Sequence, residues 1–209
     1  EILIRFANVF EQSYTRFLDL QKAEAQVREA QIEAALERVR SRTLAMHKSV
    51  ELAETAAVLL KQLISLGIEP NRLYIGIIRN DNSEIEFWAT DEEGSKVSTP
   101  FTANANRSTT ISKMYQGWKE KKKFIEIDQQ GQELSDYLRY LSEELHATFK
   151  VGLAQSRRVQ SIAYFSQGCI GMASPEPQAE ETARLLERFA AVFNLTYTRF
   201  NDLKMAEAH

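Results

Sequence analysis

Side chains that commonly carry out chemistry are sparse in this chain of 209 residues. It has one cysteine, Cys169, and three histidines, of which only His146 lies in the central part expected to fold as a domain. A single cysteine permits no internal disulfide and no metal site built on cysteine pairs. His146 reads most simply as a polar residue near the end of a helix. We therefore expect no catalytic residue, no metal site, no cofactor and no enzymatic activity.

His47 is the sharpest candidate for a chemical role, because it follows a long helical segment as a phosphate-accepting histidine would. Histidine-kinase acceptors usually precede an acidic residue and a proline several positions on, whereas Lys48 comes next here and the first proline is Pro70. A glycine-rich nucleotide lid is also missing from the sequence. A histidine-kinase-type dimerisation and phosphotransfer segment using His47 is kept as the alternative function, together with an enzyme domain that processes a small molecule.

Composition excludes other classes of protein. The chain is 44% hydrophobic and 26% charged with a net charge of −3, which provides one core and no field that attracts nucleic acid. No apolar run approaches the roughly 18 residues that span a bilayer. The basic run at positions 119–123 is short and complements the end of a helix. We expect a cytoplasmic protein with neither nucleic acid nor membrane as a partner.

The two ends of the chain repeat each other. Residues 188–209 match residues 5–26 at most positions and at a constant offset, as in "RFAAVFNLTYTRFNDL" against "RFANVFEQSYTRFLDL". A repeat of this length indicates an array. We expect the chain to be one period cut from a longer protein, in which an adjacent repeat unit and an output domain are its partners. Residues 1–48 are then a helical connector, the tail of a preceding unit plus a coiled-coil segment, and residues 179–209 lead into the next unit.

Helix-breaking residues divide the chain in the same places. All eight glycines and all four prolines lie between positions 67 and 177, so two long helices are expected to flank a loop-rich centre. In the first helix, apolar residues recur at heptad spacing. They predict a thin coiled-coil seam of marginal stability, formed by Ala25, Ile32, Leu36, Val39 and Met46.

The central residues 49–178 show the pattern of an α+β domain. A helix capped by Ser49 and ended by Gly67 precedes alternating β-branched and aromatic runs. The expected elements after it are a hairpin at 73–90, a strand at 96–101, a polar loop at 102–108, a helix at 111–118, a strand at 124–128, a helix at 133–145 and a hairpin at 159–173. This order implies a mostly antiparallel sheet covered by helices.

With this order of elements and the segment "ISKMYQGWKEKKKFIEID" at 111–128, the chain resembles a GAF domain from about residue 49 to residue 200. The stretch "AEAQVREAQIEAALERVRSRTLAMHKS" is similar to connectors that precede GAF-like units in bacterial sensor histidine kinases and cyclases. The resemblance implies a GAF/PAS-like sheet between long flanking helices. It also implies a sensory, dimerising role in signal transduction, as in a two-component system, with any kinase or cyclase activity in a separate domain.

Members of the family also hold small ligands between the sheet and the helices and loops over one face. That resemblance makes eight residues the candidate pocket: Trp88, Phe101, Asn104, Tyr115, Trp118, Phe124, Tyr140 and Phe149. Core packing explains the aromatic ones equally well. Bilin-binding members attach their chromophore through a cysteine commonly followed by histidine, whereas Ile170 follows Cys169. The Asn-Lys-Phe-Asp-Glu set of cyclic-nucleotide-binding members is missing, and the methionine sulfoxide reductases of this fold need more than one cysteine.

Apolar residues on the terminal helices predict a parallel homodimer, because a lone helix would expose too many of them to water. The expected interface consists of Phe6, Phe10, Phe17, Leu20, Ile32, Leu36, Val39, Phe189, Phe193 and Phe200. Parallel pairing would bring both incoming helices together and both outgoing helices together. Helical phase would then carry the signal to an output domain.

Overall fold

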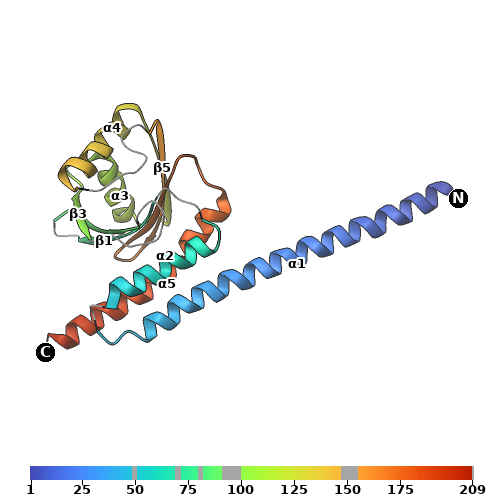
Figure 1. Cartoon of the computed structure of the whole chain (residues 1–209), viewed down its shortest axis with the longest axis horizontal. Coiled ribbons are helices and arrows are strands. Elements are labelled where there is room, and N and C mark those ends of the chain that lie inside the picture. The colour runs from blue at the N-terminus through green and yellow to red at the C-terminus, as the bar shows by residue number, and fades with distance from the viewer. Residues whose placement is uncertain (49–50, 69–71, 80–81, 91–99, 147–154, 209) are drawn as a thin grey trace.

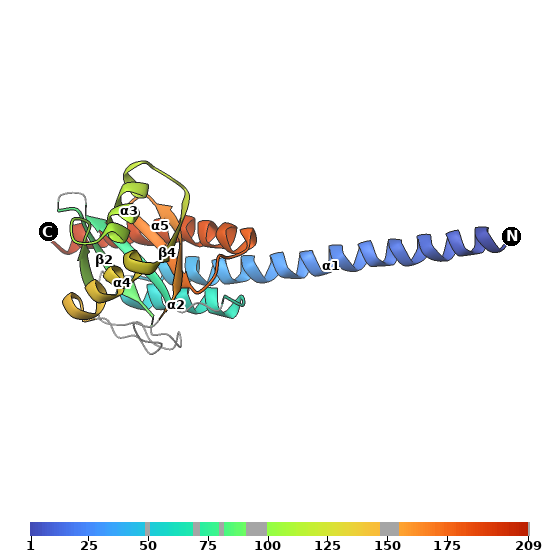
Figure 2. The ribbon, with the colours of Figure 1, turned by 90° about the horizontal axis from the view of Figure 1, so that it is seen from above.

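The computed structural model describes residues 1–48, 51–68, 72–79, 82–90, 100–146 and 155–208. A sheet with helices on both faces forms the body of the molecule, and one long helix, α1 (Ile2–Leu44), extends far beyond it (Figure 1). Seen from above, the C-terminal part of α1 lies along the body while its N-terminal part projects away (Figure 2). None of the described helices is long and apolar enough to cross a membrane.

The sheet has six strands in the order β3-β2-β1-β6-β5-β4, and every neighbouring pair is antiparallel. The strands are β1 (Arg72–Arg79), β2 (Glu84–Ala89), β3 (Phe101–Asn104), β4 (Phe124–Gln130), β5 (Arg157–Phe165) and β6 (Gly168–Ser174). Long helices α1 and α5 flank this sheet in the sequence. The predicted α+β class is confirmed.

Strand β3 differs from the prediction, which placed a strand at 96–101 and a loop at 102–108. Phe101 is opposite Phe87 and Ala103 is opposite Ile85, so the strand runs into the expected loop. Ala103 is fully buried because it faces the core in this register. The earlier part of the predicted strand lies outside the described residues, as does the predicted cap at Ser49.

One face of the sheet is covered by helix α2 (Leu52–Ser65) and helix α5 (Glu180–Glu207), and the C-terminal part of α1 packs on these two helices (Figure 1). Apolar residues three and four positions apart give each helix a buried stripe, as Leu59 and Leu63 do in α2. Three residues of the predicted heptad seam, Ile32, Leu36 and Val39, are buried in this same core. Gly67 has a φ of +89°, which suits a glycine that follows the end of α2.

The other face carries helix α3 (Thr109–Lys119) and helix α4 (Gly131–Arg139), which continues as a short π-helix, η2 (Tyr140–Glu144). The Ser108 side chain caps α3 by accepting a hydrogen bond from the Ile111 backbone N–H (3.5 Å). Apolar residues of α3 and α4 form a second core with this face of the sheet. The strands therefore separate two cores, one under each helical layer.

Helices α1 and α5 are joined by polar contacts as well as by the shared core. Arg188 of α5 donates to Glu29 (2.7 and 3.0 Å) and to Glu33 (2.5 Å) of α1. Near the other end of the contact, the buried hydroxyls of Thr43 and Thr196 share a hydrogen bond. These contacts fix both the separation and the register of the two helices.

Candidate ligand site

A small cavity lies between the sheet and α4. Its volume is about 20 Å³, which is room for about one water molecule. Two guanidinium groups and several rings from β1, β2, β3, β5, α4 and η2 line it: Arg72, Tyr74, Phe87, Ala89, Phe101, Tyr137, Leu141 and Arg158. Such a combination of planar apolar walls and a few polar groups is typical of ligand sites.

A chain of buried hydrogen bonds leads away from this cavity across the sheet. The Tyr74 hydroxyl donates to Gln160 Oε1 (3.0 Å), and Gln160 Nε2 donates to Gln129 Oε1 (2.9 Å). Gln129 Nε2 then donates to Thr110 Oγ1 (2.7 Å) at the start of α3. The chain joins β1, β5, β4 and α3, so the position of Tyr74 is coupled to that of three other elements.

Gly171 makes this chain possible. Tyr74 on β1 is opposite Gly171 on β6, and its ring crosses that glycine to reach Gln160 on β5. A Cβ atom at Gly171 would lie less than 3.0 Å from three atoms of the tyrosine side chain. The residue at this position must therefore be glycine for Tyr74 to lie flat across the sheet.

Burial keeps both tyrosines of the cavity neutral. Desolvation raises the pKa of Tyr74 well above 10 and also raises the pKa of Tyr137, although the nearby guanidinium of Arg158 opposes both shifts. Tyr74 therefore remains a hydrogen-bond donor throughout the physiological range of pH. Arg158 itself is almost fully buried and donates from its Nη1 to Gln155 Oε1 (3.0 Å).

One of the eight predicted pocket residues, Phe101, lines the cavity. Asn104 and Tyr140 are not among the lining residues but contact each other, where the Asn104 backbone N–H donates to the tyrosine oxygen (3.0 Å). Asn104 Oδ1 also accepts from the Asn106 N–H (2.8 Å), which makes it part of a turn.

The other predicted pocket residues lie elsewhere. Trp88 and Phe124 belong to the core on the opposite face of the sheet, under α2 and α5. Tyr115 and Trp118 stack on each other within α3, with ring centroids 5.8 Å apart, and Trp118 Nε1 donates to the Ser166 carbonyl. Phe149 lies outside the described residues.

Sequence reasoning missed the residues that form most of the cavity. Arg72 and Tyr74 alternate along β1, as Arg158 and Gln160 do along β5. Residues two apart on a strand point to the same face, so this alternation is the signal that could have placed the four side chains together. The rings of Tyr74 and Phe87 meet edge to face at 5.5 Å.

The polar loop before α3 has a structural role in this conformation. Arg107 donates from one nitrogen to both carboxylate oxygens of Glu144 (2.9 and 2.8 Å), which ties the loop to η2. The loop also borders an open groove of about 740 Å³ beside α3 and β4. Basic, acidic and uncharged polar side chains line this groove. That groove is wide and exposed, unlike the enclosed site at Tyr74.

Among the residues that the structure describes, neither a reactive cysteine nor a metal-binding cluster is found. Cys169 is fully buried in β6, and burial raises the pKa of its thiol to about 12. The thiol therefore stays protonated and covered, contrary to what attachment of a ligand would need. No described group of three histidine, cysteine, aspartate or glutamate side chains could hold a metal ion.

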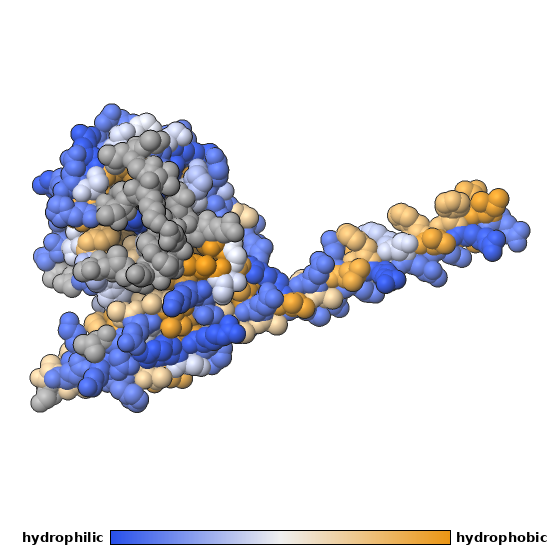
Figure 3. All heavy atoms as spheres, viewed as in Figure 1, coloured by the Kyte–Doolittle hydropathy of each residue, from blue (hydrophilic) through white to orange (hydrophobic). Residues whose placement is uncertain are grey.

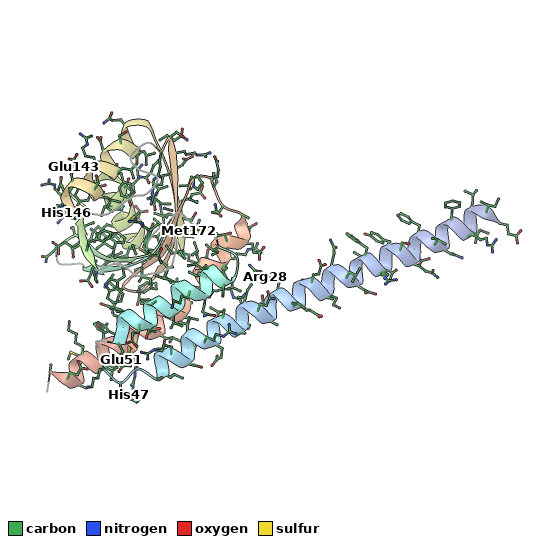
Figure 4. The ribbon with its side chains drawn as sticks, in the orientation of Figure 1. Arg28, His47, Glu51, Glu143, His146 and Met172 are labelled. Carbon is green, nitrogen blue, oxygen red and sulfur yellow. The ribbon has the colours of Figure 1, made fainter. Side chains whose placement is uncertain are left out.

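The two described histidines lie far apart, His47 at the turn between α1 and α2 and His146 beyond η2 (Figure 4). Both are exposed. At the turn, the backbone N–H of His47 donates to Glu51 (3.3 Å), and Arg42 donates to the same carboxylate (3.2 Å). Burial opposes these bonds, but together they keep the pKa of Glu51 below its ordinary value.

Comparison with known proteins gives likenesses of fold only. No protein-family model matches the sequence, and no curated relative is found by sequence. The GAF domain of a phosphoenolpyruvate-protein phosphotransferase from Acinetobacter is similar in structure, with 9% identity and a TM-score of 0.45 over 79% of this chain and 93% of that one.

Two chromophore-bound GAF domains of cyanobacterial phytochromes are also similar. The phycoerythrobilin-bound domain has 13% identity and a TM-score of 0.48 over 80% of this chain and 96% of that one. The phycocyanobilin-bound domain has 12% identity and a TM-score of 0.49 over 85% of this chain and 98% of that one. At these identities no ligand or activity carries over to this chain. All three of these similar structures are GAF domains, the family that the sequence resembles.

Proposed function

We propose that this chain is a non-catalytic sensory or regulatory unit of a bacterial signal-transduction protein, which relays a change at its sheet to its long helices. One observation carries the proposal: α5 rests on the sheet and on α1 at once. Phe193 of α5 meets Phe165 of β5 with ring centroids 5.3 Å apart. Five residues earlier on the same helix, Arg188 binds Glu29 and Glu33 of α1.

The strands offer a short path between the cavity and this helix. Tyr74 faces the cavity, while its neighbours Leu73 and Ile75 belong to the core under α2 and α5. The same alternation applies to β5 and β6, because successive side chains of a strand point to opposite faces. A ligand that displaces Tyr74, which is hydrogen-bonded to Gln160 of β5, would therefore move a strand on which α5 rests.

The chemistry of the cavity narrows the ligand class. Rings and guanidinium groups suit a small planar molecule that carries hydrogen-bond acceptors. At about 20 Å³ the cavity holds no such molecule, so binding requires some of the side chains that line it to move outward. Because of this outward movement, binding of a ligand would displace the surrounding strands and helices.

Two features support a role without catalysis. The buried Cys169 thiol, with its pKa raised to about 12, is a poor nucleophile. His47 and His146, both exposed, are placed in different parts of the molecule (Figure 4). We assign any catalytic output to another domain of a longer protein, such as a histidine kinase or cyclase domain.

We also propose that the isolated chain forms a parallel homodimer through the projecting part of α1. Five residues of the expected interface, namely Ile32, Leu36, Val39, Phe189 and Phe193, are covered within one chain, so they offer no surface to a second copy. Phe200 is partly covered in the same way. The exposed residues of the expected set are Phe6, Phe10, Phe17 and Leu20.

Light scattering and cross-linking test this assembly. At tens of micromolar, an order that exceeds weak affinities, the chain should scatter as a dimer. Ser13→Cys, on the same face of α1 as Phe6, Phe10 and Phe17, should then form an intermolecular disulfide, since parallel pairing brings equivalent positions together. The buried Cys169 should not react. A monomer at this concentration, or a dimer that cross-links only when two different positions carry the cysteine, contradicts the parallel homodimer.

A further inference from the structure

The N-terminal half of α1 exposes a row of large apolar side chains that no described part of the chain covers. Figure 3 shows these hydrophobic residues along the projecting part of the helix, away from the body. Phe6 is 73% exposed and Phe10 is 72% exposed. Apolar surface of this extent on a soluble helix indicates an interaction site.

The internal repeat identifies what such a surface fits. In α5, the residues buried against the sheet and the other helices include Leu185, Leu186, Phe189, Ala190, Val192 and Phe193. At the offset of the repeat, the corresponding residues of α1 are Ile2, Leu3, Phe6, Ala7, Val9 and Phe10. Five of the six pairs are identical, and the sixth replaces Leu185 by Ile2, so the shape of the buried stripe is kept.

Polar contacts of α5 are repeated as well. Arg188, which binds Glu29 and Glu33, corresponds to Arg5. Thr196, whose hydroxyl meets that of Thr43, corresponds to Ser13, which keeps a hydroxyl. The Asn194 oxygen, which accepts from the Ser166 N–H (3.2 Å), corresponds to a carboxylate that can accept the same bond, at Glu11.

The exposed apolar positions of α5 at 191 and 195 are not kept. Ala191 and Leu195 become Asn8 and Gln12 in α1. Glu187 and Asn201, which are partly covered, change in the other direction, to Ile4 and Leu18. From 185 to 195, apolar residues are therefore kept where α5 is buried, and the two exposed ones become polar. A repeat retained only for helix propensity would show no such relation to burial.

We propose that residues 2–20 form the helix that completes the core of another unit of this architecture. In that unit they would pack on the sheet, on α2 and on the C-terminal half of α1, as α5 does in this one. The occupant of the exposed face is thus a second unit of the same kind, placed before this one in a longer chain. A single helix of 43 residues then belongs to two cores, which transmit rotation or tilt to each other without a linker between them. This proposal is independent of whether the unit binds a ligand.

Within a longer chain, the width of the stripe favours the core of another unit as its partner over a second α1, which is the partner proposed above for the isolated chain only. Six of the nine positions from 185 to 193 are buried in α5, because that helix contacts a sheet and two helices. A two-stranded coiled coil buries only two positions in seven. The apolar face that the repeat keeps in α1 is as wide as the buried face of α5. It therefore suits packing against a sheet and two helices rather than against a single helix.

A graft within the full chain tests the proposal. Residues 185–203, "LLERFAAVFNLTYTRFNDL", are replaced by the sequence of residues 2–20, "ILIRFANVFEQSYTRFLDL". The graft changes seven of the nineteen residues, and none of these changes replaces a buried apolar residue by a polar one. We therefore expect one cooperative thermal transition, by circular dichroism, with a Tm within about 10 °C of the native value. A second graft keeps Asn201, whose side chain donates to Gln167 (2.9 Å).

The control graft uses residues 4–22 in the same place, which turns the same apolar residues by about 200° at 100° per residue. It should show no cooperative transition. The proposal is overturned if both in-phase grafts fail to unfold cooperatively, because the α1 sequence then does not fit the seat of α5. It is equally overturned if the shifted graft matches the in-phase graft, because any amphipathic helix would then suffice.

Discussion

Gly171→Ala should destabilise the chain through Tyr74. The added Cβ would lie less than 3.0 Å from the tyrosine ring, so the ring must move. It packs on Phe87 and donates to Gln160, and neither contact survives a displacement of this kind. Overpacking costs about 1–3 kcal/mol and the lost buried hydrogen bond about 1 kcal/mol more, which gives a Tm lower by roughly 4–16 °C in a chain of this size.

A double-mutant cycle in urea or thermal unfolding isolates that cause. Tyr74→Ala removes the ring, so Gly171→Ala should cost far less in that background than in the native one. Tyr74→Phe keeps the ring and removes only the hydroxyl, so it should retain the full cost of the clash. If the costs of Gly171→Ala and Tyr74→Ala simply add, the ring does not lie across the glycine and the described geometry of the cavity is wrong.

Three further outcomes follow from the described contacts. Cys169 should resist thiol reagents at pH 8 until the chain is unfolded, and stability should fall as pH rises from about 9 towards about 12, since burial raises the thiol pKa in the folded state alone. Thr196→Val should lower the free energy of unfolding by about 1 kcal/mol in urea. Thr43→Val should cost less in that variant than in the native chain, because the two hydroxyls share one hydrogen bond. Strict additivity of the two costs would contradict that bond. Arg188→Ala should lower the Tm by at most about 3 °C at low salt and by less at 1 M salt. The pairing should weaken as pH falls below 4.5, since the hydrogen bond from Arg188 lowers the pKa of Glu29. A Tm change independent of salt would show that packing rather than charge is responsible.

The order of the elements could be predicted because it depends on local patterns. Breaker-free segments at both ends became α1 and α5, and runs of β-branched residues between turns became the strands. Strand β3 was misplaced because its four residues are held by pairing with β2 rather than by their own preference. The seven-residue spacing of Ile32 and Val39 predicted a buried stripe correctly but not its partner, since a helix packed inside a domain shows nearly the same period.

The cavity was harder to predict than the fold. Phe87 and Trp88 are adjacent in one strand and therefore point to opposite faces, yet nothing local tells which face will be covered by α4. The sequence therefore favoured Trp88, whereas the structure places Phe87 at the site. Arg158 and Gln160 were missed because polar residues in a strand usually face water, and here the layer formed by α3 and α4 buries them.

The central claim is that a change at the cavity reaches the helices on the other face of the sheet. Hydrogen exchange at residues 185–196 of α5 tests it, with Gly171→Ala compared against Gly131→Ala. The control destabilises the chain in another way, because its added Cβ meets nothing within 4 Å but is strained at a φ of +55°. Both chains are measured at temperatures that give equal global stability. We predict faster exchange in this part of α5 only for Gly171→Ala. Equal protection of α5 in the two variants would mean that the two faces are uncoupled, and the relay proposed here would be contradicted.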